Sequence, residues 1–124
     1  MRGVHLTADL SGCPAGAPLM LDAEVLRAHC VGAVARAGLG AVAELFHRFT
    51  PAPGQPQGGV TGVVLLAESH LAVHTWPELG AVTLDVYVCN LATDNSAKAE
   101  ALMDLLTTGF KPLHAERQRL LRGQ

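Results

Sequence analysis

The chain has 124 residues, the usual length of one domain, and we expect residues 1–124 to fold as a single unit. Hydrophobic residues make up 49% of it, which excludes a disordered chain, and no run reaches the roughly 18 apolar residues of a membrane-spanning helix. The formal net charge of −2 gives no electrostatic reason to expect nucleic acid as a partner. No apolar signal segment opens the sequence and its three cysteines are widely spaced, so we expect a cytoplasmic protein with reduced thiols.

The first third of the chain predicts a strand, a loop and a helix. Apolar and polar residues alternate over residues 4–10, the pattern of a half-buried strand, and residues 11–20 contain the glycines and prolines of a loop. Asp22 is a suitable N-cap for a helix that runs to residue 37, with Gly38 at its C-terminal cap. One stripe of this helix is apolar: Val25, Leu26, Cys30, Ala33, Val34 and Ala37.

Strands dominate the middle of the chain. We expect strands over residues 41–49, 60–67, 71–75 and 81–89, because these runs are apolar and β-branched or alternate in polarity. Between the first two, residues 51–59 are rich in proline and glycine and predict a flexible loop.

A second helix is expected near the end of the chain. Asp94 or Ser96 would cap its N-terminus, Gly109 and Pro112 would end it, and its apolar face would include Leu102, Leu105 and Leu106. The chain beyond is basic, which indicates a solvated face or an edge strand rather than a binding site, through Lys111, Arg117, Arg119 and Arg122. Together these elements predict an α+β fold, a two-layer sandwich with helices on one face of a mainly antiparallel sheet.

Conventional catalytic motifs are scarce. The sequence has no glycine-rich phosphate-binding motif, and its two lysines, Lys98 and Lys111, offer little support for a pyridoxal enzyme. His70, His74 and Cys89 could be imagined as zinc ligands, but a fourth ligand or a bound water would still be required. We therefore expect no metal.

The segment from Glu68 to Glu78 concentrates functional side chains. It holds the only Trp of the chain, two of its six His, two carboxylates and a serine, between two apolar strands. Each residue alone has a structural explanation, since a serine after a strand is usually a turn residue and a strand cysteine usually belongs to the core. Their concentration next to Cys89, on a neighbouring predicted strand, favours a functional site.

This segment resembles the core motif of the prokaryotic S-adenosylmethionine decarboxylases. The residues that carry the resemblance are Glu68-Ser69-His70-Leu71, His74-Thr75-Trp76-Pro77-Glu78, Asp85 and Cys89. At family spacing the resemblance covers nearly the whole chain, through His5-Leu6-Thr7-Ala8-Asp9-Leu10, Gly12-Cys13, Ala37-Gly38, Phe46-His47-Arg48-Phe49 and Gly59-Val60-Thr61-Gly62-Val63-Val64.

The resemblance implies a proenzyme that cuts itself between Glu68 and Ser69 and converts Ser69 into a pyruvoyl group. It also implies that His74 acts as a base in this processing and that Thr61 assists it, in the place of a family serine. The expected products are a β chain of residues 1–68 and an α chain of residues 69–124 that begins with the pyruvoyl group.

The resemblance further implies how decarboxylation would proceed. The pyruvoyl carbonyl would form a Schiff base with the α-amine of the substrate and act as the electron sink when carbon dioxide leaves. Cys89 would then protonate the product as the general acid, which suits a thiol because its ordinary pKa is about 8.5. Glu78 would hold the ribose hydroxyls, Phe49 would stack on adenine, and Trp76 is the third expected substrate-binding residue.

A homodimer is also implied, in which two sheets pack as an αββα sandwich with the active sites near the interface. The sequence independently favours self-association, because Val and Leu side chains on the strand faces away from the helices need a cover.

Several positions depart from the family pattern. The loop from Thr50 to Gly59 is longer than the family's link, and Asn90 replaces a usual glycine. Three positions that are commonly aromatic hold Ser11, Leu79 and Ala81. These departures concern the choice of substrate and leave the reacting residues unchanged.

S-Adenosylmethionine is the favoured substrate, because Phe49, Trp76 and Glu78 are all present. Its decarboxylated product would be the aminopropyl donor for spermidine synthesis. L-Arginine or L-ornithine, with agmatine or putrescine as the product, stays open as an alternative, because both offer the same reacting α-amine and α-carboxylate. A non-catalytic relative is disfavoured, since Ser69 and Cys89 are both present.

Overall fold

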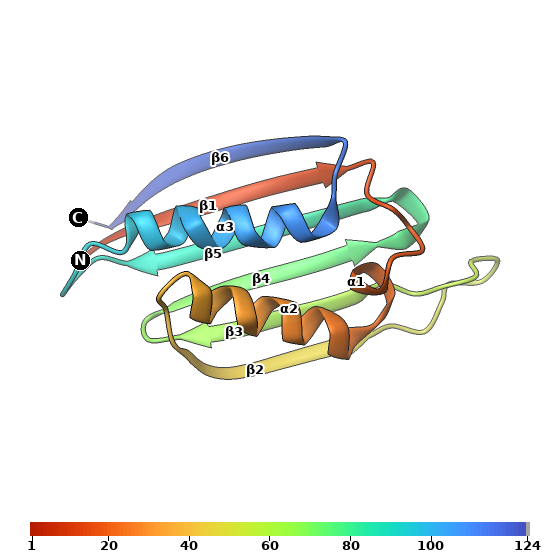
Figure 1. Ribbon diagram of the computed structural model, residues 1–124, viewed down its shortest axis with the longest axis horizontal. Helices are drawn as coiled ribbons and strands as arrows, with labels where there is room; N and C mark the ends of the chain where they lie inside the picture. Colours follow the sequence, from red (N-terminus) through yellow and green to blue (C-terminus); the bar gives the residue numbers. More distant parts are fainter. Residues whose placement is uncertain (124) are drawn as a thin grey trace.

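The computed structural model describes residues 1–123, which form two layers, a six-stranded sheet and a layer of helices (Figure 1). Within these residues the elements follow one another as β1 (Arg2–Ser11), α1 (Pro18–Leu21), α2 (Ala23–Arg36), β2 (Ala41–Arg48), β3 (Val60–Leu66), β4 (Ser69–Trp76), η1 (Pro77–Leu79, a 3₁₀ turn), β5 (Ala81–Cys89), α3 (Ser96–Phe110) and β6 (His114–Gly123).

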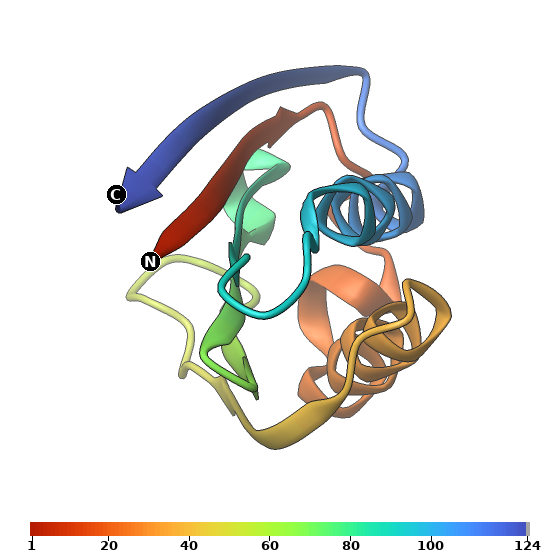
Figure 2. The same cartoon turned by 90° about the vertical axis from the view of Figure 1, so that its left-hand side faces the viewer.

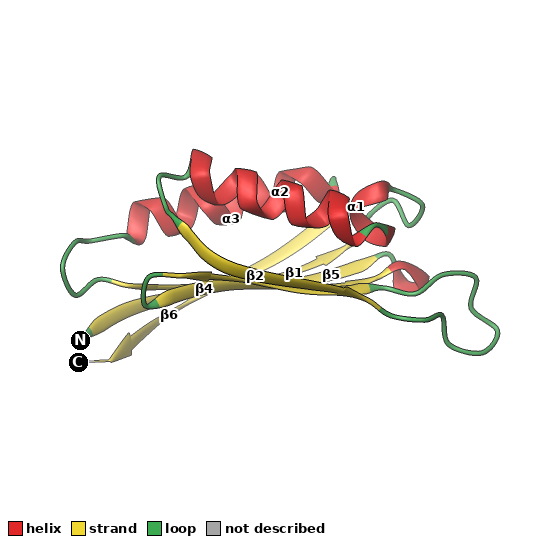
Figure 3. Cartoon of the chain, turned by 90° about the horizontal axis from the view of Figure 1, so that it is seen from below, coloured by secondary structure: helices red, strands yellow, loops and turns green. Residues whose placement is uncertain are grey.

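The sheet is antiparallel throughout, with the strand order β2-β3-β4-β5-β1-β6. Helices α2 and α3 lie side by side across one face, and no helix of residues 1–123 covers the other (Figure 3). Seen along the strands, the sheet curves around the helices, with β2 and β6 at its two edges (Figure 2). The predicted α+β fold, with helices on one face of an antiparallel sheet, is therefore confirmed.

The core lies between the helices and the sheet. Alternate residues of β1, β3, β4 and β5 point to the helices and are buried. This confirms the alternation that predicted β1 and β5 and the apolar runs that predicted β3 and β4. Burial of such aliphatic side chains contributes about 25 cal/mol per Å² of apolar area and holds the two layers together. The largest side chains that are fully buried include Met20, Leu26, Leu71, Leu84, Leu102, Met103 and Leu106.

Helix α2 begins where the sequence predicts. The Asp22 side chain accepts hydrogen bonds from the backbone N–H groups of Glu24 and Val25, at 2.9 and 3.2 Å, and so satisfies two free donors of the first turn. At the other end Gly38 follows the helix with a φ of 85°. Val25 lies outside the buried stripe, because it is 38% exposed. The buried members of the predicted stripe are Leu26, Cys30, Ala33, Val34 and Ala37.

The structure corrects two predictions in the connecting segments. A short helix, α1, overlaps the end of the predicted loop 11–20 and extends to Leu21, with Pro18 at the first helical position and Met20 buried. Strand β4 begins at Ser69 rather than at Leu71, because Ser69 already pairs with β3. Ser69 is therefore a strand residue and not a turn residue.

Helix α3 differs from its prediction at both ends. Its N-cap is Asn95, while the Asp94 side chain accepts a 2.9 Å hydrogen bond from the backbone N–H of Ser96, the first helical residue. The helix also continues through Gly109, which was expected to end it. Gly109 serves close packing instead, since a Cβ at this position would lie 2.4 Å from the His29 ring of α2.

The basic end of the chain forms β6, an edge strand, as predicted. It pairs with β1 along its whole length. Arg117 of β6 forms ion pairs with Glu100 and Asp104 of α3. These ion pairs connect the edge strand to the helix.

The sheet face away from the helices is open and partly apolar. Leu45 of β2, Leu65 of β3 and Leu120 of β6 lie on it and are 70%, 47% and 57% exposed. Apolar side chains gathered on one face in this way mark a surface suited to a partner. Among residues 1–123, no helix has the length and apolar character needed to cross a membrane.

Candidate active site

The hairpin between β3 and β4 turns through two residues, Ala67 and Glu68, directly before Ser69. Leu66 and Ser69 face each other as the last pair of these strands. Glu68 has a φ of 53°, in the left-handed region, and Lys111 is the only other non-glycine residue among 1–123 with a positive φ. This conformation costs a residue with a Cβ about 1–2 kcal/mol. The backbone is therefore strained at the peptide bond that the resemblance marks for cleavage.

Ser69 and Cys89 are neighbours in space. Ser69 is the first residue of β4 and Cys89 the last residue of β5, and these two strands pair antiparallel. The backbone N–H of Cys89 donates a 3.0 Å hydrogen bond to Ser69 Oγ. From the other side, the Asn95 side-chain amide donates a 2.9 Å hydrogen bond to the Cys89 carbonyl oxygen. The backbone of Cys89 is thus held in place between Ser69 and the start of α3.

A pocket of about 340 Å³, which we call the hairpin pocket, opens beside these residues. Glu68 and Cys89 line it together with Asn95 and Lys98 from the start of α3. The sequence did not single out Asn95 or Lys98 for this site. No local pattern could have done so, because their position depends on how α3 packs beside the hairpin.

Asn90 fixes the segment between β5 and α3. Its side chain accepts a 2.7 Å hydrogen bond from the backbone N–H of Asn95 and donates one of 3.0 Å to Ser96 Oγ. The glycine that the resemblance leads us to expect at this position could form neither bond. Asn90 therefore stabilises the start of α3, which in turn places Asn95 against Cys89.

Thr61 and His74 form a second pair, on the open face of the sheet. They are opposite partners on β3 and β4, and Thr61 Oγ1 lies 2.9 Å from His74 Nδ1. When the neutral ring carries its proton on Nδ1, this nitrogen donates to the Thr61 hydroxyl oxygen, which fixes the ring and leaves the lone pair of Nε2 free to accept a proton. The His74 ring also lies 5.8 Å from that of Trp76, at an interplanar angle of 30°.

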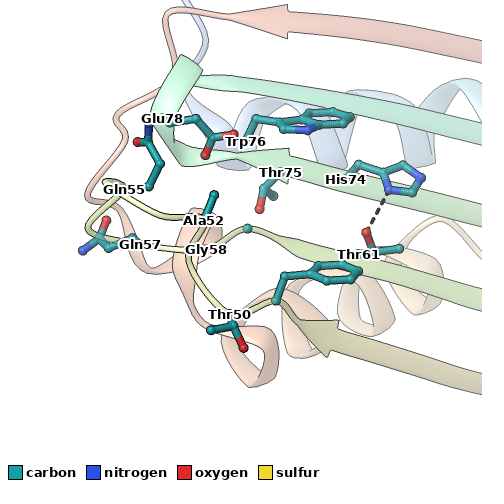
Figure 4. Close-up of a pocket in the computed structure, with 12 residues that line it drawn as sticks. Thr50, Ala52, Gln55, Gln57, Gly58, Thr61, His74, Thr75, Trp76 and Glu78 are labelled. Atoms are coloured by element: carbon teal, nitrogen blue, oxygen red, sulfur yellow. Dashed lines mark hydrogen bonds between the residues drawn. The ribbon is translucent and has the colours of Figure 1, made fainter.

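A pocket of about 370 Å³, the loop pocket, adjoins this pair (Figure 4). Trp76 and His74 extend along the sheet side of the pocket, and Glu78 lies at its other end, beside Gln55 of the loop. The loop of residues 50–59 supplies the rest of the wall. Five residues singled out from the sequence line this pocket: Phe49, Thr61, His74, Trp76 and Glu78.

Two glycines fix the base of this loop. A Cβ on Gly58 would lie 1.9 Å from the carbonyl oxygen of Phe49, and one on Gly59 would lie 2.0 Å from that of Thr75. Only glycine permits such close approach of two backbones. The Gly59 carbonyl oxygen also accepts a 2.9 Å hydrogen bond from the Phe49 N–H. The long loop is thereby anchored as a wall of the pocket.

The β3–β4 hairpin and the loop of residues 50–59 lie at opposite ends of the strands (Figure 1), and the pockets that they line are separated accordingly. Ser69 and His74 are five residues apart on β4, which at about 3.3 Å per residue separates them by about 16 Å. A general base must come within hydrogen-bond distance of the proton that it removes. One chain therefore brings Glu68, Ser69 and Cys89 together at one end of the sheet. It brings Thr61 and His74 together with the expected substrate-binding residues at the other end. The two groups do not meet within one chain.

The three cysteines lie in different environments. Cys13 and Cys30 are buried, and burial raises the pKa of both thiols, that of Cys30 to about 12. Cys89 is half-buried and lines the hairpin pocket. All three are free thiols, and Cys89 is the one that a bound molecule can reach.

Comparisons with known proteins all match the same family, and the matches cover almost the whole length of this chain. The family model described as S-adenosylmethionine decarboxylase matches residues 4–123. The S-adenosylmethionine decarboxylase proenzyme of Aquifex aeolicus is 39% identical over 122 residues, which cover 98% of this chain and 81% of that protein. The proenzyme of the same name from Archaeoglobus fulgidus is 36% identical over 121 residues, covering 98% and 97%. The crystal structure of the adenosylmethionine decarboxylase from Aquifex aeolicus matches with a TM-score of 0.84 and 37% identity, over 98% of this chain and 91% of that chain.

Proposed function

This chain belongs to the S-adenosylmethionine decarboxylase family, and we propose that it is a self-processing enzyme that decarboxylates S-adenosylmethionine. The product is decarboxylated S-adenosylmethionine, the aminopropyl donor of polyamine synthesis. The observation that carries the proposal is the contact between Ser69 and Cys89, because it joins the residue that would become the cofactor to the residue that would protonate the product.

The first step is cleavage of the peptide bond between Glu68 and Ser69. The Ser69 hydroxyl attacks the carbonyl carbon of Glu68, and the acyl group moves from nitrogen to oxygen to give an ester. A base removes the Cα proton of residue 69, the Cβ–Oγ bond breaks, and its electron pair leaves with the Glu68 carboxylate. Water then replaces the nitrogen, which departs as ammonia. The left-handed conformation of Glu68 supports this step, since cleavage releases its strain.

The residues at this end fit a pyruvoyl group made from Ser69. Ser69 supplies the carbon atoms, its oxygen accepts a hydrogen bond from the backbone N–H of Cys89, and the hairpin pocket leaves about 340 Å³ for the amino-acid part of a substrate. The pyruvoyl carbonyl supplies the electron sink for the loss of carbon dioxide. The role of Cys89 is to deliver a proton to the Cα atom of the product from its half-exposed thiol.

The loop pocket suits the nucleoside part of the substrate. Phe49 is 49% exposed and can stack on adenine, and the π face of Trp76, which is 37% exposed, suits a purine or a sulfonium. The carboxylate of Glu78 can accept hydrogen bonds from both ribose hydroxyls. The pair of Thr61 and His74 adjoins this pocket and would serve as the base of processing.

Each complete site is proposed to combine the hairpin pocket of one chain with the loop pocket of a second. The support is the separation of about 16 Å between Ser69 and His74 along β4, which no base could span. When two sheets pack through their open faces around a two-fold axis that runs across the strands, opposite ends of the two sheets come together. The exposed apolar side chains of that face, including Leu45 and Leu65, favour such packing, so the minimal functional unit is a homodimer.

The test of this function is the release of carbon dioxide from S-adenosylmethionine, L-arginine and L-ornithine by one cleaved preparation. We expect kcat/KM to be highest for S-adenosylmethionine by more than tenfold, because Phe49 and Glu78 contribute binding only to a nucleoside. A preference of more than tenfold for either amino acid would overturn the assignment of the substrate.

A further inference from the structure

The hairpin pocket contains one positively charged residue that the proposed reaction does not use. Lys98 is the only cationic residue among those that line this pocket. Its side chain is half-buried and forms no ion pair or hydrogen bond with any residue that the structure describes. This cation without a partner lines the same pocket as Glu68, the residue that precedes the proposed cleavage site.

The local helix does not explain Lys98. It lies in the first turn of α3, which contains no acidic residue, and the helix dipole disfavours a positive charge at that end. Its stem passes close to Gly38, where an added Cβ would lie 3.6 Å from Lys98 Cε. The stem of Lys98 therefore lies next to Gly38, in the segment between α2 and β2.

Cleavage of the Glu68–Ser69 bond would create negative charge in the same pocket. The neutral peptide carbonyl of Glu68 becomes a carboxylate, next to the side-chain carboxylate that this residue already carries. One residue at the tip of a two-residue hairpin then bears two negative charges, and the single cation lining the pocket is Lys98.

We propose that Lys98 binds the carboxylate that cleavage creates at Glu68 and thereby holds the new end of the β chain against the start of α3. The proposal rests on the self-cleavage described under the proposed function. Lys98 acts here as a positioning residue, because holding Glu68 keeps the freed end out of the space beside Cys89 that the substrate enters.

The carboxylate of the substrate is the other anion that could reach this pocket. A lysine bound to it would stabilise the charged carboxylate before carbon dioxide leaves and would so oppose the reaction, whereas the carboxylate of Glu68 persists after processing. The chemistry therefore favours the carboxylate of the chain itself.

The experiment measures how fast a carboxypeptidase removes Glu68 from the β chain of the folded, cleaved protein without substrate. It compares the wild type with Lys98→Gln, Lys98→Arg and Lys111→Asn, where Lys111 is the other lysine of the chain and lies outside both pockets. We expect Lys98→Gln to lose Glu68 about two- to fivefold faster, as for a partly exposed ion pair, while Lys98→Arg and Lys111→Asn behave as the wild type. At about 1 M salt the difference should shrink, because charges are then screened within about 3 Å.

Denaturing mass spectrometry before the protease is added separates the two proposals. An intact chain in the wild type and in all three variants would contradict self-cleavage itself. Cleaved chains with equal trimming rates in Lys98→Gln and the wild type would overturn the role of Lys98, as would faster trimming in Lys111→Asn. Unchanged trimming with a raised KM for S-adenosylmethionine in Lys98→Gln would assign Lys98 to the substrate carboxylate instead. Loss of cleavage in Lys98→Gln alone would place its action before the carboxylate exists and would also overturn the proposal.

Discussion

The backbone N–H of Cys89 donates a 3.0 Å hydrogen bond to the side-chain oxygen of Ser69. This bond joins the first residue of β4 to the last residue of β5, and Asn95 holds the same Cys89 from the side of α3. Ser69, the residue proposed to become the cofactor, and the backbone of Cys89, the proposed general acid, are thus fixed by two strands and a helix, rather than by a mobile loop.

Replacing Cys89 by alanine should separate decarboxylation from protonation. We expect Cys89→Ala to be cleaved normally but to turn over about 10²- to 10⁴-fold more slowly, the range typical of a lost general acid. A larger share of protons should reach the carbon of the cofactor, which mass spectrometry would detect as alanine at the start of the α chain. Cys89→Ser, which keeps the size of the side chain, is the matched control, and its turnover should lie between that of the wild type and that of Cys89→Ala. Wild-type turnover in Cys89→Ala would exclude it as the acid.

The hydroxyl of Thr61 should support processing through His74. Thr61→Val keeps the shape of the side chain but removes the 2.9 Å contact to His74 Nδ1, so we expect cleavage to slow about two- to tenfold. Thr61→Ser should stay near the wild-type rate. The control is Thr83→Val, since Thr83 faces His74 from the opposite strand, β5, without bonding to it. Equal rates in Thr61→Val and Thr83→Val would show that the hydroxyl has no role.

Phe49 and Glu78 should contribute to substrate binding and not to processing. Phe49→Ala loses the stacking of an aromatic pair, about 0.5–1.5 kcal/mol beyond the contact area, and should raise KM for S-adenosylmethionine by tenfold or so. Glu78→Gln keeps its size but weakens the hydrogen bonds to the ribose. Both variants should still be cleaved at wild-type rates. If either variant is not cleaved, the replaced residue takes part in processing, which would contradict this prediction.

The fold could be predicted from the sequence almost completely, because its alternating strands and the cap at Asp22 are local signals. Gly109 has the sequence pattern of a helix end but lies inside α3, since the sequence does not reveal that the His29 ring of another helix packs against it. The helix α1 escapes prediction for a similar reason, because only the buried contacts of Met20 give its four residues a stable position.

The candidate site could be predicted only in part. The segment around Ser69 and its proximity to Cys89 follow from strand order, and the structure places them as expected. The separation of Ser69 from His74 follows from their spacing along one strand. That this separation places the two residues in different pockets becomes evident only from the structure. Asn95 and Lys98 reach the hairpin pocket through helix packing, which no local pattern encodes.

Stability should depend on pH through a thiol far from the site. Burial raises the pKa of Cys30 to about 12, well above that of an exposed thiol, so the folded state retains its proton where the unfolded chain loses it. The stabilising contribution is complete below about pH 9 and is lost as pH rises towards 12, by roughly 1 kcal/mol at pH 10. Urea unfolding at pH 8 and pH 10 should show this loss in the wild type and a smaller one in Cys30→Ala. An identical loss in both proteins would contradict the burial of this thiol as its cause.

The claim that two chains build each site is tested most directly by co-expressing Ser69→Ala and His74→Ala with different purification tags. Ser69→Ala alone should remain one chain because it lacks the nucleophile, and His74→Ala alone should remain one chain because both of its sites lack the base. In a mixed dimer purified through both tags, one site pairs the intact Ser69 of the second variant with the intact His74 of the first. Denaturing mass spectrometry should then show the His74→Ala chain cut between residues 68 and 69 and the Ser69→Ala chain whole. A mixed dimer in which both chains stay intact would contradict a site shared between two chains.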